Sequence, residues 1–432
     1  MSNALDDAHR EKLHQAFVDQ LKSKGILGVQ GIEAAFRAVP RHLFLPDVEP
    51  EKVYCDDAIV TKYADGMVIS SSSQPSLMAI MLEQLQLEPG HRVLEIGAGT
   101  GYNAALMAHI VGNSGQVVTI DIDEDIVENA RTHLAAAGFD VVQVICADGG
   151  LGYPAVAPFD RIILTVSAGD IAPAWWKQLK PGGRLLLPLS LRGLQVVVAF
   201  ERAADHLVSS ATTCGSFIGL RGAFAEPGYY VKLDSEQGLL HLRLTEQRSV
   251  EAKDIYQLLT GPSRDVTTQL QVTSRQIFDG LNLWLTLHEP QFCALVALDN
   301  AVERGIMPSI FNIKTQTTLG VLGETSLSVL LPSDPSRFGH IDAFAFELFV
   351  RSFGPDDTLT QRFIEQIRAW DAAGRPGEEN LSIKVYPRDT DYTPVAGEVV
   401  ITNRWTKLAI SWREICMDYQ HRNPRRGSTS YP

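Results

Sequence analysis

Cysteine is scarce in this chain of 432 residues and never occurs in close pairs. The five cysteines are scattered, odd in number and without any C-x-x-C spacing; they are Cys55, Cys146, Cys214, Cys293 and Cys416. This distribution argues against a disulfide framework and against a zinc site, and it fits a reducing compartment. We therefore expect no metal centre and a cytoplasmic location.

The chain also lacks long hydrophobic runs and an excess of positive charge. No apolar stretch reaches the length needed to cross a membrane, and residues 1–20 are charged and amphipathic, unlike a signal peptide. The formal net charge of −13 is unfavourable for contact with phosphate backbones. We therefore expect neither a membrane nor a nucleic acid as partner.

The length of the chain is sufficient for two domains. Residues 92–200 alternate apolar strands with helical stretches, which is typical of a parallel, doubly wound α/β sheet. Beyond about Gly228 this alternation ends, and we predict an α+β domain there. The predicted organisation is a domain over 1–228 with N-terminal helices at 8–50 and a cofactor core at 80–200, a second domain over 229–420, and a flexible tail over 421–432.

Three segments carry more specific expectations. Residues 266–285 have helical spacing, whereas residues 399–405 and 407–412 have the pattern of a late strand pair. An apolar run at 215–219 could add a closing antiparallel strand to the first sheet.

The most informative stretch is Arg92-Val-Leu-Glu-Ile-Gly-Ala-Gly-Thr-Gly101. It predicts a buried strand that ends in a turn containing Gly97, Gly99 and Gly101, followed by a helix. Glycines at such a turn let the backbone approach a ligand at the edge of the sheet where α/β folds bind nucleosides. The spacing is G-x-G-x-G rather than the G-x-G-x-x-G of a pyrophosphate cradle. S-adenosylmethionine is therefore a better candidate ligand than a dinucleotide.

Acidic residues stand at or near the ends of three successive predicted strands. Asp121 ends the strand after the glycines, where a carboxylate can accept hydrogen bonds from ribose hydroxyls. Asp148, followed by Gly149, could accept a bond from an adenine amino group, and Glu95 could fix the amino end of the ligand. Each acid alone could instead cap a helix. Their joint occurrence with the glycine turn favours a nucleoside site.

Four ordered segments resemble the class I methyltransferases: Glu95-Ile-Gly-Ala-Gly-Thr-Gly101, Ala147-Asp-Gly149, Pro158-Phe-Asp-Arg-Ile-Ile163 and Leu179-Lys-Pro-Gly-Gly-Arg-Leu-Leu-Leu-Pro188. Three more resemble the protein-L-isoaspartate O-methyltransferase family: Val39-Pro-Arg-His-Leu-Phe44, Tyr54-Cys-Asp56 and Ser71-Ser-Ser-Gln-Pro75. The resemblance implies a Rossmann-like, seven-stranded sheet and conversion of S-adenosylmethionine to S-adenosylhomocysteine. It also implies methylation of isoaspartyl or aspartyl carboxylates in proteins or peptides, as in protein repair.

The chain departs from this family in several respects, among them Ser71-Ser72-Ser73 where the family has Thr-Ile-Ser. Ala58 stands where the family usually has a proline, and the link that follows is longer by a handful of residues within 61–66. The C-terminal half is absent from the ordinary repair enzyme. These traits resemble an extended branch associated with ribosomally made peptide natural products, which implies methylation of an aspartate in a precursor peptide. A catalytically inactive, cofactor-binding interaction protein is the remaining alternative.

Methyl transfer to a carboxylate requires alignment and exclusion of water rather than an acid–base group. A desolvated carboxylate does need hydrogen-bond donors. By the family match, Ser73 is the donor nearest the reacting carboxylate and Ser71 is its neighbour. The alternative is that these serines only cap the helix starting near Pro75.

Two further residues are candidates for substrate contact. Asp56 is predicted to bind a substrate donor, and Arg221 to reach a substrate carboxylate, with a surface ion pair as an equal alternative for Arg221. The C-terminal domain has no motif that identifies a chemistry. We expect it to select the acceptor, by docking a leader peptide or covering the active site, or to mediate a homodimer.

Overall fold

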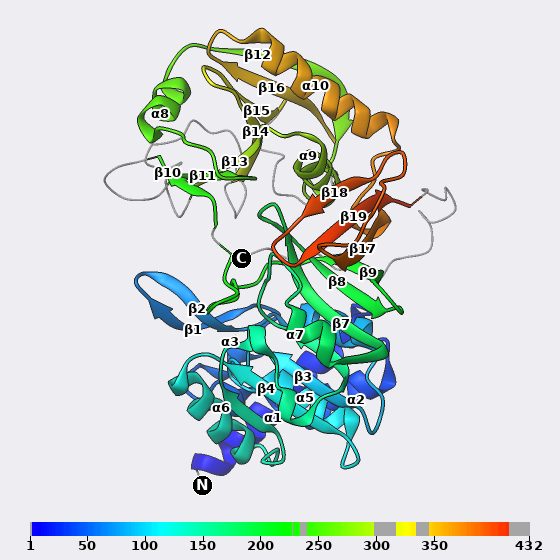
Figure 1. Cartoon of the computed structure of the whole chain (residues 1–432). Helices are drawn as coiled ribbons and strands as arrows, with labels where there is room; N and C mark the ends of the chain where they lie inside the picture. The colour runs from blue at the N-terminus through cyan, green and yellow to red at the C-terminus, as the bar shows by residue number, and fades with distance from the viewer. Residues whose placement is uncertain (1, 227, 234–239, 298–316, 334–344, 414–432) are drawn as a thin grey trace.

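A computed structural model describes residues 2–226, 228–233, 240–297, 317–333 and 345–413. The chain forms two lobes, with the N-terminal residues in the lower lobe of Figure 1 and the segment from β10 to α10 in the upper lobe. Each lobe is built around one large sheet. None of the described helices combines the length and the apolar character needed to span a membrane.

The lower lobe contains a ten-stranded sheet with the order β18-β19-β17-β9-β8-β7-β6-β3-β4-β5. The strands β3 to β7 are parallel, and β8 and β9 are antiparallel additions. This topology confirms the predicted doubly wound α/β class. The bounds are β3 Arg92–Ile96, β4 Gln116–Asp121, β5 Gln143–Cys146, β6 Phe159–Leu164, β7 Leu179–Leu191, β8 Leu194–Arg202 and β9 Leu207–Cys214.

Helices cover both faces of this sheet, and the apolar core consists of two clusters. One apolar cluster joins the sheet to α1, α2, α4, α5 and α6, and the other contains Trp175 of α7. Burying a large apolar side chain contributes about 1.5–3 kcal/mol, so these two clusters hold the sheet in place. The helices are α1 Ser2–Ser23, α2 Gln30–Ala38, α3 Pro50–Val53, α4 Pro75–Leu85, α5 Tyr102–Val111, α6 Glu124–Ala136 and α7 Pro173–Gln178.

The longer link after Asp56 forms an antiparallel β-hairpin of β1 Ile59–Ala64 and β2 Met67–Ser72. Its turn consists of Asp65 and Gly66, whose φ angles are 51° and 76°. A type I′ turn needs positive φ at both central positions, and Asp-Gly is among the sequences that adopt it readily. The extra residues therefore fold into a defined element, which projects from the lower lobe in Figure 1.

The upper lobe is an antiparallel sheet with the order β10-β11-β13-β14-β15-β16-β12. Helix α10 packs against it through Leu359, Phe363, Ile367 and Trp370, which share one helical face and are buried. The bounds are β10 Tyr230–Lys232, β11 Leu240–Leu244, β12 Ser263–Val272, β13 Phe292–Ala297, β14 Thr317–Leu322, β15 Leu327–Pro332, β16 Phe346–Phe353, α8 Ala252–Thr260, η4 Gln276–Leu281, α9 Asn282–His288 and α10 Asp357–Ala372.

The placement of the C-terminal strands differs from the predicted division into domains. β17 Leu381–Pro387, β18 Val399–Thr402 and β19 Thr406–Trp412 leave the upper lobe and extend the lower sheet, where β17 pairs with β9. The predicted domain over 229–420 therefore does not form one unit, although its late strand pair is confirmed. The predicted tail over 421–432 lies outside the described residues.

Two local predictions were wrong. Residues 266–272, predicted as helix, belong to β12, and only the later part of 266–285 is helical. The β-branched run at Val266, Thr267 and Thr268 favours a strand at this place. Residues 215–219 contribute a single bridge, between Ser167 and Gly219, rather than a strand in the described part of the chain.

Candidate active site

A cavity of about 760 Å³ lies at the carboxyl ends of β3 and β4. Its volume lies within the range of sites for small molecules, about 300–1,000 Å³. The cavity joins the glycine turn to the hairpin and to the start of α4. Its lining includes Val60, Ile69, Ser70, Ser71, Ser72, Ser73, Gln74, Glu95, Gly97, Gly99, Asp121, Thr165, Cys214 and Phe217.

The glycine turn approaches its neighbours too closely for a side chain. At Gly97 the φ angle is 103°, and a Cβ atom there would lie 2.5 Å from Oγ1 of Thr165. That hydroxyl donates a hydrogen bond of 2.7 Å to the carbonyl of Gly97 and so fixes the turn. Gly99 and Gly101 also have positive φ. Gly97 and Gly99 line the cavity, whereas Gly101 does not, and a cofactor-binding role for the three glycines stays a prediction.

Glu95 is completely buried beneath this turn. Its two carboxylate oxygens accept hydrogen bonds from Nδ2 of Asn103, at 2.7 Å, and from Oγ1 of Thr119, at 2.6 Å. Burial raises the pKa of Glu95 to about 7, and the two hydrogen bonds oppose part of that rise. Asn103 and Thr119, which were not predicted from the sequence, thus hold both oxygens of this carboxylate.

Asp121 lies beside the glycine turn at the end of β4. Its carboxylate accepts hydrogen bonds from the backbone amides of Gly99, at 3.2 Å, and Ile122, at 2.9 Å. Burial raises the pKa of Asp121, and these backbone donors partly counter that shift. The residue lines the cavity, so Asp121 and the glycine turn come together as expected.

Asp148 and Gly149 follow β5, outside the set of cavity-lining residues. The Asp148 carboxylate accepts hydrogen bonds from the amides of Gly150, at 2.9 Å, and Ala223, at 2.8 Å. Gly149 is buried, and its carbonyl accepts a bond of 2.9 Å from the indole of Trp175. Because a carboxylate has about four acceptor sites, Asp148 retains capacity for a further donor. Its role toward adenine stays a prediction.

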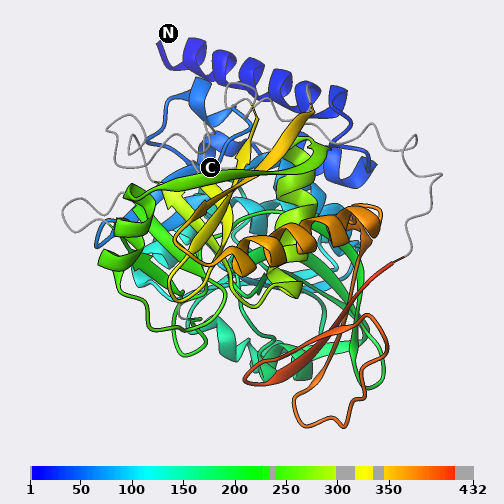
Figure 2. The same ribbon diagram turned by 90° about the horizontal axis from the view of Figure 1, so that it is seen from above.

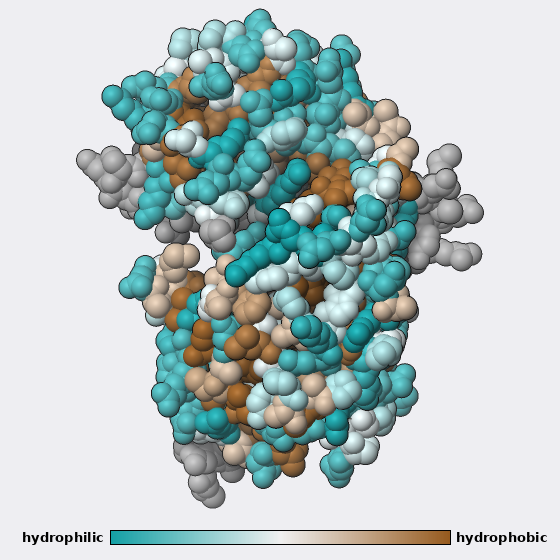
Figure 3. All heavy atoms as spheres, viewed as in Figure 1, coloured by the Kyte–Doolittle hydropathy of each residue, from teal (hydrophilic) through white to brown (hydrophobic). Residues whose placement is uncertain are grey.

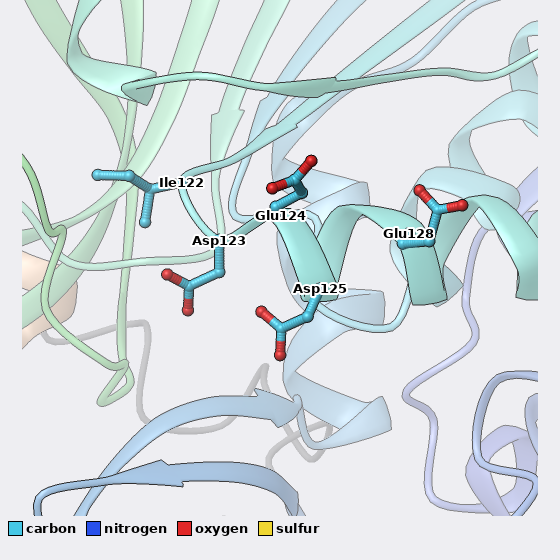
Figure 4. A pocket seen from close by; sticks show the side chains of 5 residues that line it. All are labelled: Ile122, Asp123, Glu124, Asp125 and Glu128. Atoms are coloured by element: carbon cyan, nitrogen blue, oxygen red, sulfur yellow. The ribbon is translucent and has the colours of Figure 1, made fainter.

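Arg221 forms an ion pair rather than facing the cavity. Its guanidinium donates two hydrogen bonds to Asp123, at 2.8 and 3.1 Å, and lies 3.9 Å from Asp121. This contact lowers the pKa of Asp123. Lys62 of the hairpin also binds Asp123, at 3.2 Å, and Asp125, at 2.7 Å. Figure 4 shows the Asp123 and Asp125 carboxylates pointing toward the hairpin. The ion-pair alternative for Arg221 therefore holds in this structure.

Ser71 and Ser73 line the cavity and are half-buried. In the part of the chain that the structure describes, neither hydroxyl takes part in a hydrogen bond. The cap of α4 is Gln74, without a side-chain capping bond, and the amide of Ser76 is instead bound by the carboxylate of Asp56 at 2.9 Å. The serines therefore do not cap the helix. Asp56 caps it instead and does not line the cavity, so substrate binding by Asp56 stays a prediction.

Arg41, which was not singled out from the sequence, binds residues Ser72 and Ser73 and so holds this segment in place. Its side chain is completely buried and donates to the carbonyls of Val53, at 2.9 Å, and Asp57, at 3.1 Å. It also binds the hydroxyl of Ser72, at 3.2 Å, and the carbonyl of Ser73, at 3.1 Å. One guanidinium thus joins the segment before the hairpin to the segment after it. No spacing rule in the sequence signals this role.

One group of described side chains, of which Cys214 lines the cavity, has the spacing of metal ligands. Ligand atoms of Cys214, Asp279 and Glu378 lie within 4.8 Å of one another. Asp279 also forms an ion pair of 3.2 Å with Arg275, whose charge opposes that of a cation. We assign no metal to this group.

A family model described as "Protein-L-isoaspartate(D-aspartate) O-methyltransferase (PCMT)" matches residues 11–223. The chain is 36% identical over 228 residues to a protein-L-isoaspartate O-methyltransferase of Methanopyrus kandleri, covering 52% of this chain and 99% of that protein. It is 42% identical over 181 residues to one of Thermotoga maritima, covering 41% and 57%. A solved structure titled protein-L-isoaspartate O-methyltransferase is 26% identical, covers 87% of this chain and 96% of its own, and has a TM-score of 0.47.

Proposed function

The chain belongs to the protein-L-isoaspartate O-methyltransferase family, and from this premise we propose that it methylates isoaspartyl or aspartyl side-chain carboxylates of a protein or peptide. The observation that carries the proposal is the single cavity that joins the glycine turn and Asp121 to Ser71 and Ser73. The proposed cofactor residues and the proposed hydroxyl donors therefore line the same cavity.

The residues present fit S-adenosylmethionine, the cofactor of this family. Gly97 and Gly99 line the cavity with backbone, and Asp121 and Glu95 offer acceptors beside them for ribose hydroxyls and an amino group. When bound, the cofactor supplies an activated methyl group. We assign Gly97, Gly99, Gly101, Glu95 and Asp121 to its binding.

Asp148 and Gly149 complete the proposed cofactor site on the adenine side. The Asp148 carboxylate is already directed by two backbone amides, so an adenine amino group would meet an oriented acceptor. The indole of Trp175 donates a hydrogen bond to the carbonyl of Gly149 and so fixes the turn after β5.

Ser73 and Ser71 are the proposed donors to the acceptor carboxylate. An aspartyl carboxylate is ionised at neutral pH, because its ordinary pKa is about 4, and needs no base. It does lose water on entry, and neutral hydroxyls can replace part of that hydration without bringing a competing charge. Arg41 holds the carbonyl of Ser73 and so positions this donor.

A second candidate function is methylation of an unmodified aspartate during peptide biosynthesis. It is favoured by the hairpin and by the residues beyond 223, which fall outside the family match. A catalytically inactive, cofactor-binding protein is a weaker alternative, because the glycine turn, Asp121 and the serines all remain at one cavity.

The experiment is transfer of radiolabelled methyl from S-adenosylmethionine to two peptides of identical sequence, one with isoaspartate and one with aspartate. Base-labile label on the isoaspartyl peptide supports repair-type activity, and label on the aspartyl peptide supports the biosynthetic alternative. Cofactor binding without label on either peptide contradicts both and favours the inactive protein.

A further inference from the structure

Asp123 follows Asp121 closely in the chain but does not line the cavity, and it holds the guanidinium of Arg221. Two nitrogens of that guanidinium donate hydrogen bonds of 2.8 and 3.1 Å to the two carboxylate oxygens of Asp123. One of these nitrogens lies 3.9 Å from the carboxylate of Asp121, which is beyond hydrogen-bond distance. Arg221 is thus bound to one carboxylate and stands beside a second, which we assign to the cofactor.

The carboxylate of Asp121 has a limited number of acceptor positions. A carboxylate offers about four of them, and the backbone amides of Gly99 and Ile122 occupy two. The remaining positions are those that we propose for the ribose hydroxyls. Because an arginine donates two parallel hydrogen bonds to a carboxylate, Arg221 would occupy these positions if it turned from Asp123 to Asp121.

The backbone on both sides of Arg221 is fixed, which keeps its side chain within reach of Asp121. The amide of Leu220, before it, and the amide of Ala223, after it, each donate a hydrogen bond of 2.8 Å to another segment of the lower lobe. Neither bond involves Asp123. A substitution of Asp123 therefore leaves the backbone of Arg221 in place and releases only its side chain.

Lys62 of the β1–β2 hairpin also binds Asp123. Its ammonium group lies 3.2 Å from the carboxylate of Asp123 and 2.7 Å from that of Asp125. Hydrogen bonds from Arg221 and Lys62 hold the pKa of Asp123 below its usual range, so Asp123 stays ionised. The hairpin projects to the left in Figures 1 and 2, and the margin of the lower lobe below it is hydrophilic in Figure 3. These ion pairs therefore join the hairpin to the residue that retains Arg221.

We propose that Asp123 is a positioning residue, which retains the guanidinium of Arg221 and thereby keeps the carboxylate of Asp121 available to the cofactor. Without the paired oxygens of Asp123, the guanidinium turns to Asp121 and competes with the ribose hydroxyls for its oxygens. The inference rests on the proposed function, because it takes Asp121 as the ribose acceptor. A purely structural ion pair would differ in one respect, since removing Arg221 as well would then bring no recovery of cofactor binding.

The test is calorimetric titration of the full chain and its variants with S-adenosylhomocysteine. Asp123→Asn keeps the shape of the side chain but offers a single acceptor oxygen, and it should weaken binding by about tenfold. Adding Arg221→Met to that variant should restore the affinity to within about threefold of the original, because the competing cation is gone. Asp123→Ser has the same expected effect, and serine suits the N-cap position of α6 that Asp123 occupies.

Asp125→Asn is the matched control, because Asp125 shares Lys62 with Asp123 but is not a hydrogen-bond partner of Arg221 in the described part of the chain. It should leave the affinity nearly unaltered. Unaltered affinity in both Asp123 variants, an equal loss in Asp125→Asn, or a loss that Arg221→Met does not reverse would overturn the inference. Absence of binding by the original chain would contradict the inference and the proposed function together. Binding without methyl transfer to either peptide would contradict the proposed function alone.

Discussion

Glu95 and Asp121 reach the cavity from neighbouring strands, yet their surroundings differ. Glu95 is bound by two side chains, whereas Asp121 is bound by backbone amides at the glycine turn. Both carboxyls have raised pKa values because they are desolvated. The partners of Glu95 are side chains, whereas those of Asp121 are backbone amides. Glu95 is also the more deeply buried of the two, so we choose it to test the effect of desolvation.

Glu95→Gln should change how stability depends on pH. The pKa of Glu95 in the folded protein is about 7, above its ordinary value of 4.5, so the folded state holds a proton that the unfolded state has released. Between these values the free energy of unfolding falls as pH rises. From about pH 5.5 to about pH 8 the original protein should lose roughly 2 kcal/mol relative to the variant.

Urea unfolding of both proteins at several pH values measures this difference. All other titrating groups are common to the two, so their contributions cancel in the comparison. Parallel stability curves would show that Glu95 titrates normally and would contradict the desolvation argument.

Ser73→Ala should slow methyl transfer without affecting the cofactor. A hydrogen bond to a charged group contributes about 1.5–3 kcal/mol, so kcat/KM should fall by roughly 10- to 100-fold. The affinity for S-adenosylhomocysteine should not change, because Ser73 is assigned to the acceptor. Ser71→Ala should have a smaller effect of the same kind. Undiminished methylation in both variants would mean that other groups bind the acceptor.

Among the secondary-structure elements, the turn between β18 and β19 contacts the segment beside Asp148 in the lower lobe. The amide of Trp405 donates a bond of 2.7 Å to Asp170, and its ring lies 4.7 Å from that of Phe224. Phe224 occupies the space beside Gly150, and the amide of Ala223 binds Asp148. The C-terminal strands therefore support the segment that orients Asp148.

Trp405→Ala should weaken binding of S-adenosylhomocysteine by about tenfold, corresponding to about 1.4 kcal/mol. Trp405→Phe keeps an aromatic ring against Phe224 and should retain most of the affinity. Trp412→Ala is a control on β19, because Trp412 stacks on Trp284, at 5.8 Å, rather than on Phe224. In calorimetric titrations, equal losses in the Trp405 and Trp412 variants would indicate general destabilisation and contradict a specific coupling.

Elements with strong local patterns could be predicted from the sequence. The alternation of β3 to β7 with helices, the glycine turn and the late strand pair are all local patterns, and they were confirmed. The pairing of β17 with β9 could not be predicted, because it joins Val385 to Leu207 across a long stretch of chain. Periodicity identifies a strand but not its partner. Arg41 was missed for a related reason, since most of its partners are backbone carbonyls that lie far from it in the sequence.

At the scale of the whole molecule, the chain passes from the lower lobe to the upper lobe and returns, and its C-terminal strands pack in the core of the lower lobe. Leu381, Ile383, Val385, Leu408 and Ile410 are buried in the same core as the parallel strands. Leu283 and Leu287 of α9 join that core from the upper lobe. The upper lobe is thus an insertion between β9 and β17, and the lower sheet is complete only when the chain returns.

A chain ending at residue 228 should therefore aggregate rather than fold as an independent methyltransferase domain. Truncation leaves β9 with an open edge and removes the apolar side chains that β17 and β19 place on the core, and both changes favour association. Size-exclusion chromatography and thermal unfolding measure the outcome. A monodisperse truncated chain with the full chain's affinity for S-adenosylhomocysteine would contradict this view of the architecture.

The most direct test of the account is calorimetric titration of the full chain with S-adenosylhomocysteine, alongside Asp121→Ala. We expect one binding site per chain and an affinity that falls by at least about tenfold in the variant, because a largely desolvated acceptor is lost. Absence of binding heat in a protein whose circular dichroism and thermal unfolding are those of a folded chain would contradict it.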